Sequence, residues 1–326
     1  MKLSRRGFNA GAAAILPAAA LGFQTARAET FPSQDLRFVC GFAAGSGADV
    51  IVRFFAEKIR QSAKRNAIVE NRVGALGNIA TEYTARSKPD GHTILVTGGS
   101  ALAATQNMLK HPTFNVGEVL RPIGTINRQP VMIAVRTDAP WKNLKELAAA
   151  MKQKGDKGSY ATANSSARVV GALFKQRAGL DTLEVQYRTG ADYLNDLASG
   201  NVDFGIPDNV MAVAQEKAGR LRVLGVSTPQ RMQAAPGYPT IMEQGFDVNL
   251  SGWFAAFVAA GTPTPIVAQL NRWLNEAVNS PEGKKFLNGF ASDPWVNSPE
   301  DAQALFLKEI KAWAEYVTIA KIEKQG

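Results

Sequence analysis

The chain alternates short apolar runs with longer segments in which apolar residues recur every three or four positions. The first run, residues 36–40, is followed by a glycine-rich turn and then by helical spacing over 50–63. Two more runs, at 67–71 and 93–97, also end in glycine-containing turns, and a further helix is expected between them. Strands that alternate with helices predict a parallel sheet with right-handed crossovers.

The same alternation starts again near residue 127. It predicts strands at 131–135, 160–162, 183–187, 202–206 and 221–226, with helices at 142–152, 168–178 and 191–198. A last strand is expected near 253–258, where it could rejoin the first sheet. Prolines then mark the starts of three helices, at 265–277, 281–290 and 299–320.

This order predicts an α/β protein of two domains, each a mostly parallel sheet flanked by helices. The boundaries expected are 29–126 with 252–326 for domain I, and 127–251 for domain II. A length of 326 residues fits two domains. When two such domains face each other, the loops at the carboxyl ends of their strands point into the cleft between them.

The N-terminus has the organisation of an export signal. The segment Ser4–Phe8 contains two adjacent arginines, an apolar stretch of 14 residues covers 10–23, and Ala26–Ala28 offers a small-residue cleavage site. The apolar stretch is shorter than the roughly 20 residues that span a bilayer. We therefore expect residues 1–28 to be removed and the remainder to be soluble in the periplasm. The arginine pair favours the twin-arginine route, and the Sec route is the alternative.

Composition removes several classes of function. The formal charge is +9, but four basic residues and no acidic ones lie in residues 1–28, which leaves +5 for the remainder and no basic run that would suit nucleic acid. One cysteine excludes a disulfide framework and a cysteine-based zinc site, and two histidines offer little for a histidine metal site. We expect no metal and no cofactor, and we expect both His92 and His111 to be exposed.

The glycine-rich loops after the first three strands are the strongest local signals of binding. Glycine lets backbone N–H groups approach a ligand, and a helix N-terminus favours an anion. The first loop, Gly45–Asp49, has the spacing G-x-G without the remaining residues of a dinucleotide fingerprint or a P-loop. Taken alone, it is more typical of a tight turn in which Asp49 caps the next helix than of a binding loop.

Five segments in order resemble the Bug-type substrate-binding receptors of tripartite tricarboxylate transporters. The resemblance runs from about Phe31 to the C-terminus, and its motifs are F-A-A-G-S-G-A-D (42–49), V-E-N-R-V-G-A-L-G-N-I (69–79), K-P-D-G-H-T-I-L (88–95), G-N-V-D-F with D-N (200–204 and 208–209) and A-A-G-T-P (259–263). It implies a two-domain Venus-flytrap receptor that binds a small carboxylate and delivers it to permease subunits in the inner membrane. It also implies a monomer that is not an enzyme.

The resemblance also implies which residues bind the carboxylate. The first loop supplies backbone amides and the other loops supply polar side chains; the positions are Ala44, Gly45, Ser46, Gly47, Asp49, Asn78, Ser100, Ser165, Ser166 and Asp208. Arg168 stands where the family commonly has His or Thr, so it is a candidate to clamp a second carboxylate, with a solvent-exposed arginine as the alternative. For Asp208 three roles stay open: a ligand contact, a helix cap, or a contact across the closed cleft.

Other departures from the family pattern concern the backbone. Cys40 and Ala43 occupy positions of family prolines, and Cys40 is expected to be a small buried apolar residue. Ile206 and Pro207 replace a Met-Phe pair before Asp208.

Two other functions compete with a transport receptor. An enzyme lacks support because there is no G-x-S-x-G elbow and no convincing histidine triad, although α/β scaffolds can host catalysis. A periplasmic sensor with the same ligand chemistry cannot be distinguished from a transport receptor by sequence. The ligand itself stays open among tricarboxylates, dicarboxylates, amino acids and aromatic acids.

Overall fold

The computed structural model describes residues 31–324, and the part of the chain from Pro32 onward forms one compact unit. The predicted export signal, residues 1–28, lies outside the described residues. Within the described part, no helix is both long enough and apolar enough to cross a membrane.

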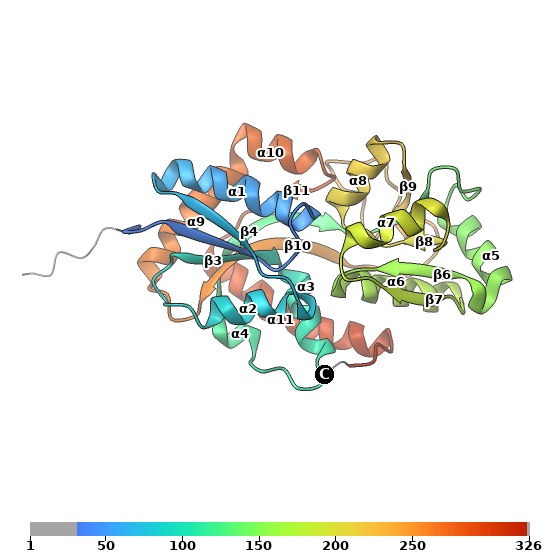
Figure 1. Ribbon diagram of the computed structural model, residues 1–326, viewed down its shortest axis with the longest axis horizontal. Helices are drawn as coiled ribbons and strands as arrows, with labels where there is room; N and C mark the ends of the chain where they lie inside the picture. Colours follow the sequence, from blue (N-terminus) through green and yellow to red (C-terminus); the bar gives the residue numbers. More distant parts are fainter. Residues whose placement is uncertain (1–30, 325–326) are drawn as a thin grey trace, which may run out of the picture. The chain divides into compact units, whose positions relative to one another are not determined.

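The unit contains two sheets with helices on their faces (Figure 1). Its strands are β1 (Leu36–Cys40), β2 (Ala67–Asn71), β3 (Thr93–Gly98), β4 (Leu120–Pro130), β5 (Met132–Arg136), β6 (Ser159–Thr162), β7 (Leu183–Gln186), β8 (Phe204–Gly205), β9 (Leu221–Val226), β10 (Ser251–Ala259) and β11 (Asp293–Pro294). Its helices are α1 (Gly47–Ala63), α2 (Asn78–Ala85), α3 (Gly99–Met108), α4 (Val116–Val119), α5 (Leu144–Lys154), α6 (Ser165–Ala178), α7 (Gly190–Ser199), α8 (Asn209–Lys217), α9 (Thr264–Asn279), α10 (Pro281–Asn288) and α11 (Pro299–Ile319), with 3₁₀ turns η1 (Ala75–Gly77) and η2 (Gly155–Lys157).

The first sheet has six strands in the order β11-β4-β10-β3-β1-β2. β1 pairs parallel with β2 and β3, as the alternation of strands and helices predicts. β10 enters between β3 and β4 and is antiparallel to both, which confirms the prediction that the strand near 253 rejoins this sheet (Figure 1). Helices α1 and α9 contact one face of the sheet, and α3 and α11 contact the other.

The second sheet has five strands in the order β7-β6-β8-β5-β9. β6 pairs parallel with β7 and β8, whereas β5 is antiparallel to β8 and β9. The expected α/β fold with two sheets is confirmed, but the expectation of mostly parallel sheets is wrong in detail because both sheets are mixed. The reason is the path of the chain: β4 leads out of the first sheet into β5, and β10 returns from the second sheet against both β3 and β4.

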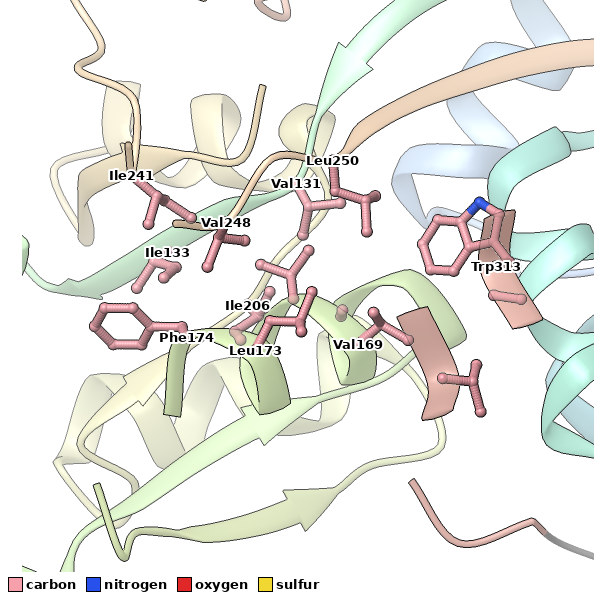
Figure 2. Close-up of a cluster of buried hydrophobic side chains, with 14 of the residues drawn as sticks. Val131, Ile133, Val169, Leu173, Phe174, Ile206, Ile241, Val248, Leu250 and Trp313 are labelled. Carbon is pink, nitrogen blue, oxygen red and sulfur yellow. The ribbon is translucent and has the colours of Figure 1, made fainter. Parts of the chain in front are cut away.

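The apolar residues of strand β5 are buried on both faces of the second sheet. Ile133 and Val135 belong to the apolar cluster that contains residues of α5 and α6. Met132 and Ala134 point to the opposite face and pack in the cluster that contains residues of α7 and α8. Figure 2 shows the first of these clusters, where Ile133 lies near Phe174.

Most element bounds fall within a few residues of those predicted. Helix α5 begins at Leu144 rather than 142, because the Asn143 side chain caps it by accepting from the Glu146 amide. Helix α6 begins at Ser165 rather than 168, because Asn164 caps it in the same way. The predicted strand over 202–206 is reduced to Phe204–Gly205. Strand β4, residues 120–130, was not predicted, since its run is interrupted by polar residues and a proline.

Candidate functional site

The loops at the strand ends enclose a cavity of about 290 Å³. Loops that follow β1, β2 and β3 line it from the first sheet, and loops that follow β6, β7 and β8 line it from the second. The segments 129–131 and 252–254, where the chain passes between the sheets, complete the lining. Loops that come from opposite sheets therefore meet around one partly open space, as ligand sites in α/β proteins do.

The first loop ends in a capped helix N-terminus. Gly45 has φ +79°, a left-handed conformation that suits glycine. Ser46 is the N-cap of α1, and its side chain accepts from the Asp49 amide at 3.3 Å. Ser46 and Gly47 line the cavity, whereas Ala44 and Gly45 do not. The amino end of a 17-residue helix is thus turned toward the cavity, and such an end favours a negative charge.

Asp49 stabilises this first loop from a buried position outside the cavity lining. It is 2% exposed and does not line the cavity. Its carboxylate accepts from the Gly45 amide, from Arg53 Nε and from Asn71 Nδ2, each at 2.8 Å. Burial alone would raise the pKa of Asp49, but these hydrogen bonds outweigh burial and hold the pKa below its ordinary value. Asp49 is therefore ionised and holds the first loop in place through its hydrogen bonds. The N-cap role that the sequence suggested for Asp49 is taken by Ser46.

Asp208 lies opposite the first loop. A Cβ placed on Gly47 would come within 2.1 Å of Asp208 Oδ1, so the aspartate carboxylate lies directly against the start of α1. Asp208 is also the N-cap of α8 and accepts from the Met211 amide at 2.9 Å. Burial raises the pKa of Asp208 above its ordinary value, against the hydrogen bonds from the backbone that favour its charged form. The structure thus places Asp208 in two of the roles that sequence left open, the helix cap and the contact between the two sheets.

The second loop carries backbone strain beside the cavity. Ala75 and Leu76 have φ of 46° and 55°, between Gly74 and Gly77, which also have positive φ. The Gly77 amide donates to the Gly74 carbonyl at 2.9 Å, which closes the turn. Non-glycine residues held in this region cost roughly 1–2 kcal/mol each. All four residues line the cavity, so the strain is stored at the candidate site.

The remaining predicted side chains divide between the cavity and its supports. Ser100 and Ser166 line the cavity. Asn78 lines a separate small space beside α3 instead. Ser165 is buried and its hydroxyl lies 2.6 Å from that of Thr105. This hydrogen bond joins α6 to α3, so Ser165 connects the second sheet to the first.

Arg168 takes neither of the positions expected for it. It is 6% exposed, which contradicts the solvent-exposed alternative, and it is not among the residues that line the cavity. Its Nε lies 3.2 Å from Glu184 Oε1, which also accepts from the Thr162 hydroxyl at 2.7 Å. Because Asn164 caps α6, Arg168 comes one turn into the helix and pairs with strand β7 instead of the cavity.

Sequence reasoning missed the loop after β7 and the first turn of α7, which follows that loop. Arg188 and Tyr193 both line the cavity. Tyr193 is 1% exposed and packs edge-on against Tyr187, with 5.7 Å between ring centroids. Among the described residues, none forms a hydrogen bond with the Tyr193 hydroxyl. The rule that singled out loops after the first three strands would have found this loop if it had been applied to the strand predicted at 183–187.

The other candidates for chemistry are accounted for within the fold. His92 is 7% exposed, so the expectation of an exposed side chain is wrong; its Nε2 accepts from the Ser33 amide at 3.2 Å. His111 is exposed as expected. Cys40 is fully buried, and burial raises the pKa of its thiol to about 11. Within residues 31–324, no group of histidine, cysteine or carboxylate side chains has an arrangement that would hold a metal ion.

Residues 51–322 match the family described as the tripartite tricarboxylate transporter family receptor. The chain belongs to this family. It is 33% identical over 307 residues to a UPF0065 protein of Bordetella bronchiseptica, an alignment that covers 93% of this chain and 91% of that protein. It is 30% identical over 298 residues to the protein BugT of Bordetella pertussis, covering 89% of this chain and 90% of BugT. The resemblance to Bug-type receptors that the loop motifs indicate is thereby confirmed.

Solved structures agree with this membership in the receptor family. The periplasmic binding protein BugD superposes with a TM-score of 0.83 at 29% identity, covering 90% of this chain and all of BugD. R. palustris Rpa4515 with adipate superposes with a TM-score of 0.85 at 27% identity, covering 90% of this chain and 99% of that one. Both relatives therefore share the two-sheet architecture along nearly their whole length.

Proposed function

We propose that this receptor captures a small carboxylate in the cavity between its two sheets, in the periplasm, and delivers it to permease subunits of a tripartite transporter. The observation that carries the proposal is the capped N-terminus of α1, which faces a cavity that loops from both sheets line. Membership in the receptor family supports the delivery step. The relative with adipate supports a carboxylate as the ligand.

The ligand carboxylate would be held by the first loop. Ser46 and Gly47 present the amino end of α1, and the positive charge of that end stabilises an anion without a cationic side chain. Ser100 and Ser166 are within the lining and would add hydroxyl donors from either sheet. Ala44, Gly45, Asp49, Asn78 and Ser165 would act by shaping and bracing these loops. None of these roles requires a cofactor or a catalytic group.

Binding and release would be coupled to a hinge motion. We infer domains of 29–126 with 252–326 and of 127–251, with the hinge near 126–128 and 250–253, close to the points where the chain leaves the first sheet after Pro130 and re-enters it at Ser251. A ligand that contacts loops of both sheets would stabilise the closed arrangement over the open one. The closed form would be the one that the permease recognises, and the receptor would act as a monomer.

A thermal-shift screen of carboxylates against the protein without residues 1–28, followed by calorimetric titration of the hits, tests the proposal. A carboxylate that binds the folded state should raise the melting temperature and bind with unchanged chemical structure. Deletion of the permease genes should abolish uptake of that carboxylate. The proposal would fail if no carboxylate bound, if the ligand were converted to a product, or if uptake persisted without the permease.

A further inference from the structure

The amino end of α1 carries two backbone amides that are free to bind an anion. The Ser46 amide donates to the Ala43 carbonyl, and the Asp49 amide donates to the Ser46 hydroxyl. No described residue accepts from the amides of Gly47 and Ala48, and both residues line the cavity. Two adjacent N–H groups at the start of a helix suit a carboxylate. The ligand carboxylate of the proposed function therefore has its place at Gly47 and Ala48.

Asp208 brings a second carboxylate to the same place. A Cβ on Gly47 would lie 2.1 Å from Asp208 Oδ1, so this carboxylate contacts the start of α1 from the side of the second sheet. It accepts from the Met211 amide of its own helix, and no described residue of α1 donates to it. A ligand carboxylate on the two free amides would therefore be a direct neighbour of the Asp208 carboxylate.

The first sheet offers no cationic side chain to this pair of carboxylates. The charged side chains nearest the start of α1, Asp49 and Arg53, pair with each other at 2.8 Å. Its loops contribute only uncharged side chains to the described lining of the cavity. The helix end itself supplies the equivalent of about half an elementary charge. That charge favours one anion at this position and is too small to neutralise two.

The second sheet contributes one cation to the described lining, Arg188, which is exposed so that water and salt screen its charge. Tyr193 lies close to Asp208 as a neutral phenol, because burial first, and then the charge of Asp208, raise the pKa of Tyr193. The segment 129–131 has no charged side chain. The charged side chains of α7 and α8 do not line the cavity; they are Asp192, Asp196, Glu216 and Lys217. Nothing in the surroundings of Asp208 therefore compensates a second negative charge.

We propose that Asp208 and the ligand carboxylate share one proton, so that the receptor takes up a proton from solvent with each carboxylate that it binds. This inference rests on the proposed function, since it concerns the same cavity. The proton lies in the hydrogen bond between an oxygen of Asp208 and an oxygen of the ligand. The pair then carries a single negative charge, which the two free amides and the end of α1 stabilise.

The physical reason is the repulsion between two carboxylates in one partly buried site. Such groups cannot both stay ionised, so the pair binds a proton more tightly than either group alone. Burial already raises the pKa of Asp208 above its ordinary value in the free receptor, and a ligand anion beside it raises that pKa further. Because the bound state holds the additional proton, affinity falls as the pH rises between the free and the bound pKa. For one proton the loss is at most about tenfold per pH unit.

Calorimetric titration measures this proton directly. The probe is the tightest carboxylate of the screen, with benzoate, hexanoate, adipate and malate among those screened. Titrations from about pH 5.5 to 8 give the affinity, and repeats in buffers of different ionisation enthalpy give the number of protons taken up. We expect uptake of at least about 0.3 proton per ligand within this range, and an affinity that falls about tenfold or more from its acid to its alkaline end.

Asp208→Asn tests which group shares the proton. Asparagine is also a favourable N-cap, so α8 should stay intact, and the melting temperature checks this. Proton uptake should fall to the small amount due to ionisation of the probe itself. Affinity near pH 8 should rise about fivefold or more over wild type, because the amide replaces a repelling charge with a hydrogen-bond donor. Asp181→Asn, at an exposed position outside the lining, is the charge-matched control and should retain the proton uptake of wild type.

The outcomes separate this inference from the function on which it rests. Absence of proton uptake in wild type, or equal uptake in wild type and Asp208→Asn, would overturn the inference while the carboxylate receptor stands. The wild-type measurement decides even if the variant does not fold. Failure of every carboxylate in the screen would overturn the proposed function itself.

Discussion

Replacing Gly47 with alanine would test whether the contact between the two sheets at Asp208 is part of ligand binding. The added Cβ would lie 2.1 Å from Asp208 Oδ1, 2.8 Å from its Cγ and 2.9 Å from Val210 Cβ. Gly47 is the first residue of α1, a position where alanine is compatible with the helix. The substitution therefore leaves the first sheet intact and obstructs the approach of α8.

The size of the effect follows from the overlap. Ordinary contacts of a Cβ begin near 3.4 Å, so the loop that carries Asp208 must retreat by more than an ångström. Overpacking of this kind costs about 1–3 kcal/mol. If the ligand binds the arrangement in which the two sheets meet, that cost is subtracted from the binding free energy. The dissociation constant should rise about 5- to 150-fold.

Calorimetric titration with the tightest carboxylate of the screen measures this change. Gly237→Ala is the matched control, because a Cβ there meets no heavy atom within 4 Å. Asp208→Ser removes the obstructing oxygen and keeps a capping hydroxyl, so the penalty of Gly47→Ala should shrink by at least half in that background. Equal affinities for Gly47→Ala and wild type would refute the reasoning, and would show that the observed contact is not part of the bound state.

Three further predictions concern the loops and the buried thiol. Asp49→Asn should lower the free energy of unfolding by about 2–4 kcal/mol at pH 7, because it weakens the charge-assisted hydrogen bond from Arg53 and leaves an amide among donors. Since the pKa of Asp49 is lowered in the folded state, the free energies of unfolding of wild type and variant, measured by urea titration, should converge as pH falls below about 4. A difference that stays constant with pH would contradict this. Ala75→Gly should raise the free energy of unfolding by about 1 kcal/mol by relieving left-handed strain, whereas Ala304→Gly, within α11, should lower it by a similar amount; the same sign for both would argue against strain. The Cys40 thiol should resist a maleimide reagent at pH 7.5 in the folded protein and react in 6 M guanidinium, because its pKa is about 11 and it is fully buried; rapid labelling of the folded form would contradict its placement.

The sequence by itself determined the elements and the family. Apolar periodicity located most strands and helices because buried β-strands and amphipathic helices impose different spacings on the chain. Loop motifs identified the receptor family because they combine glycines, which the turns require, with polar residues that a binding loop requires. The same motifs placed Ser46, Gly47, Ser100, Ser166 and Asp208 around the site, and the structure brings these five to one cavity.

Tertiary structure alone decided how the candidate residues divide their roles. Both Asp49 and Ser46 are residue types that commonly cap helices, so the sequence does not decide between them. Only the folded positions of Arg53 and Asn71, which donate to its carboxylate, make Asp49 an ionised residue that supports the loop. Arg168 has the chemistry of a clamp, but its place one turn into α6 directs it to Glu184.

Tyr193 had no signal of its own, because a tyrosine becomes part of a site only when the fold buries its ring and leaves its hydroxyl without a partner. Local patterns specify local structure. Which side chain meets which across two sheets depends on packing between segments more than a hundred residues apart, and no local pattern records that.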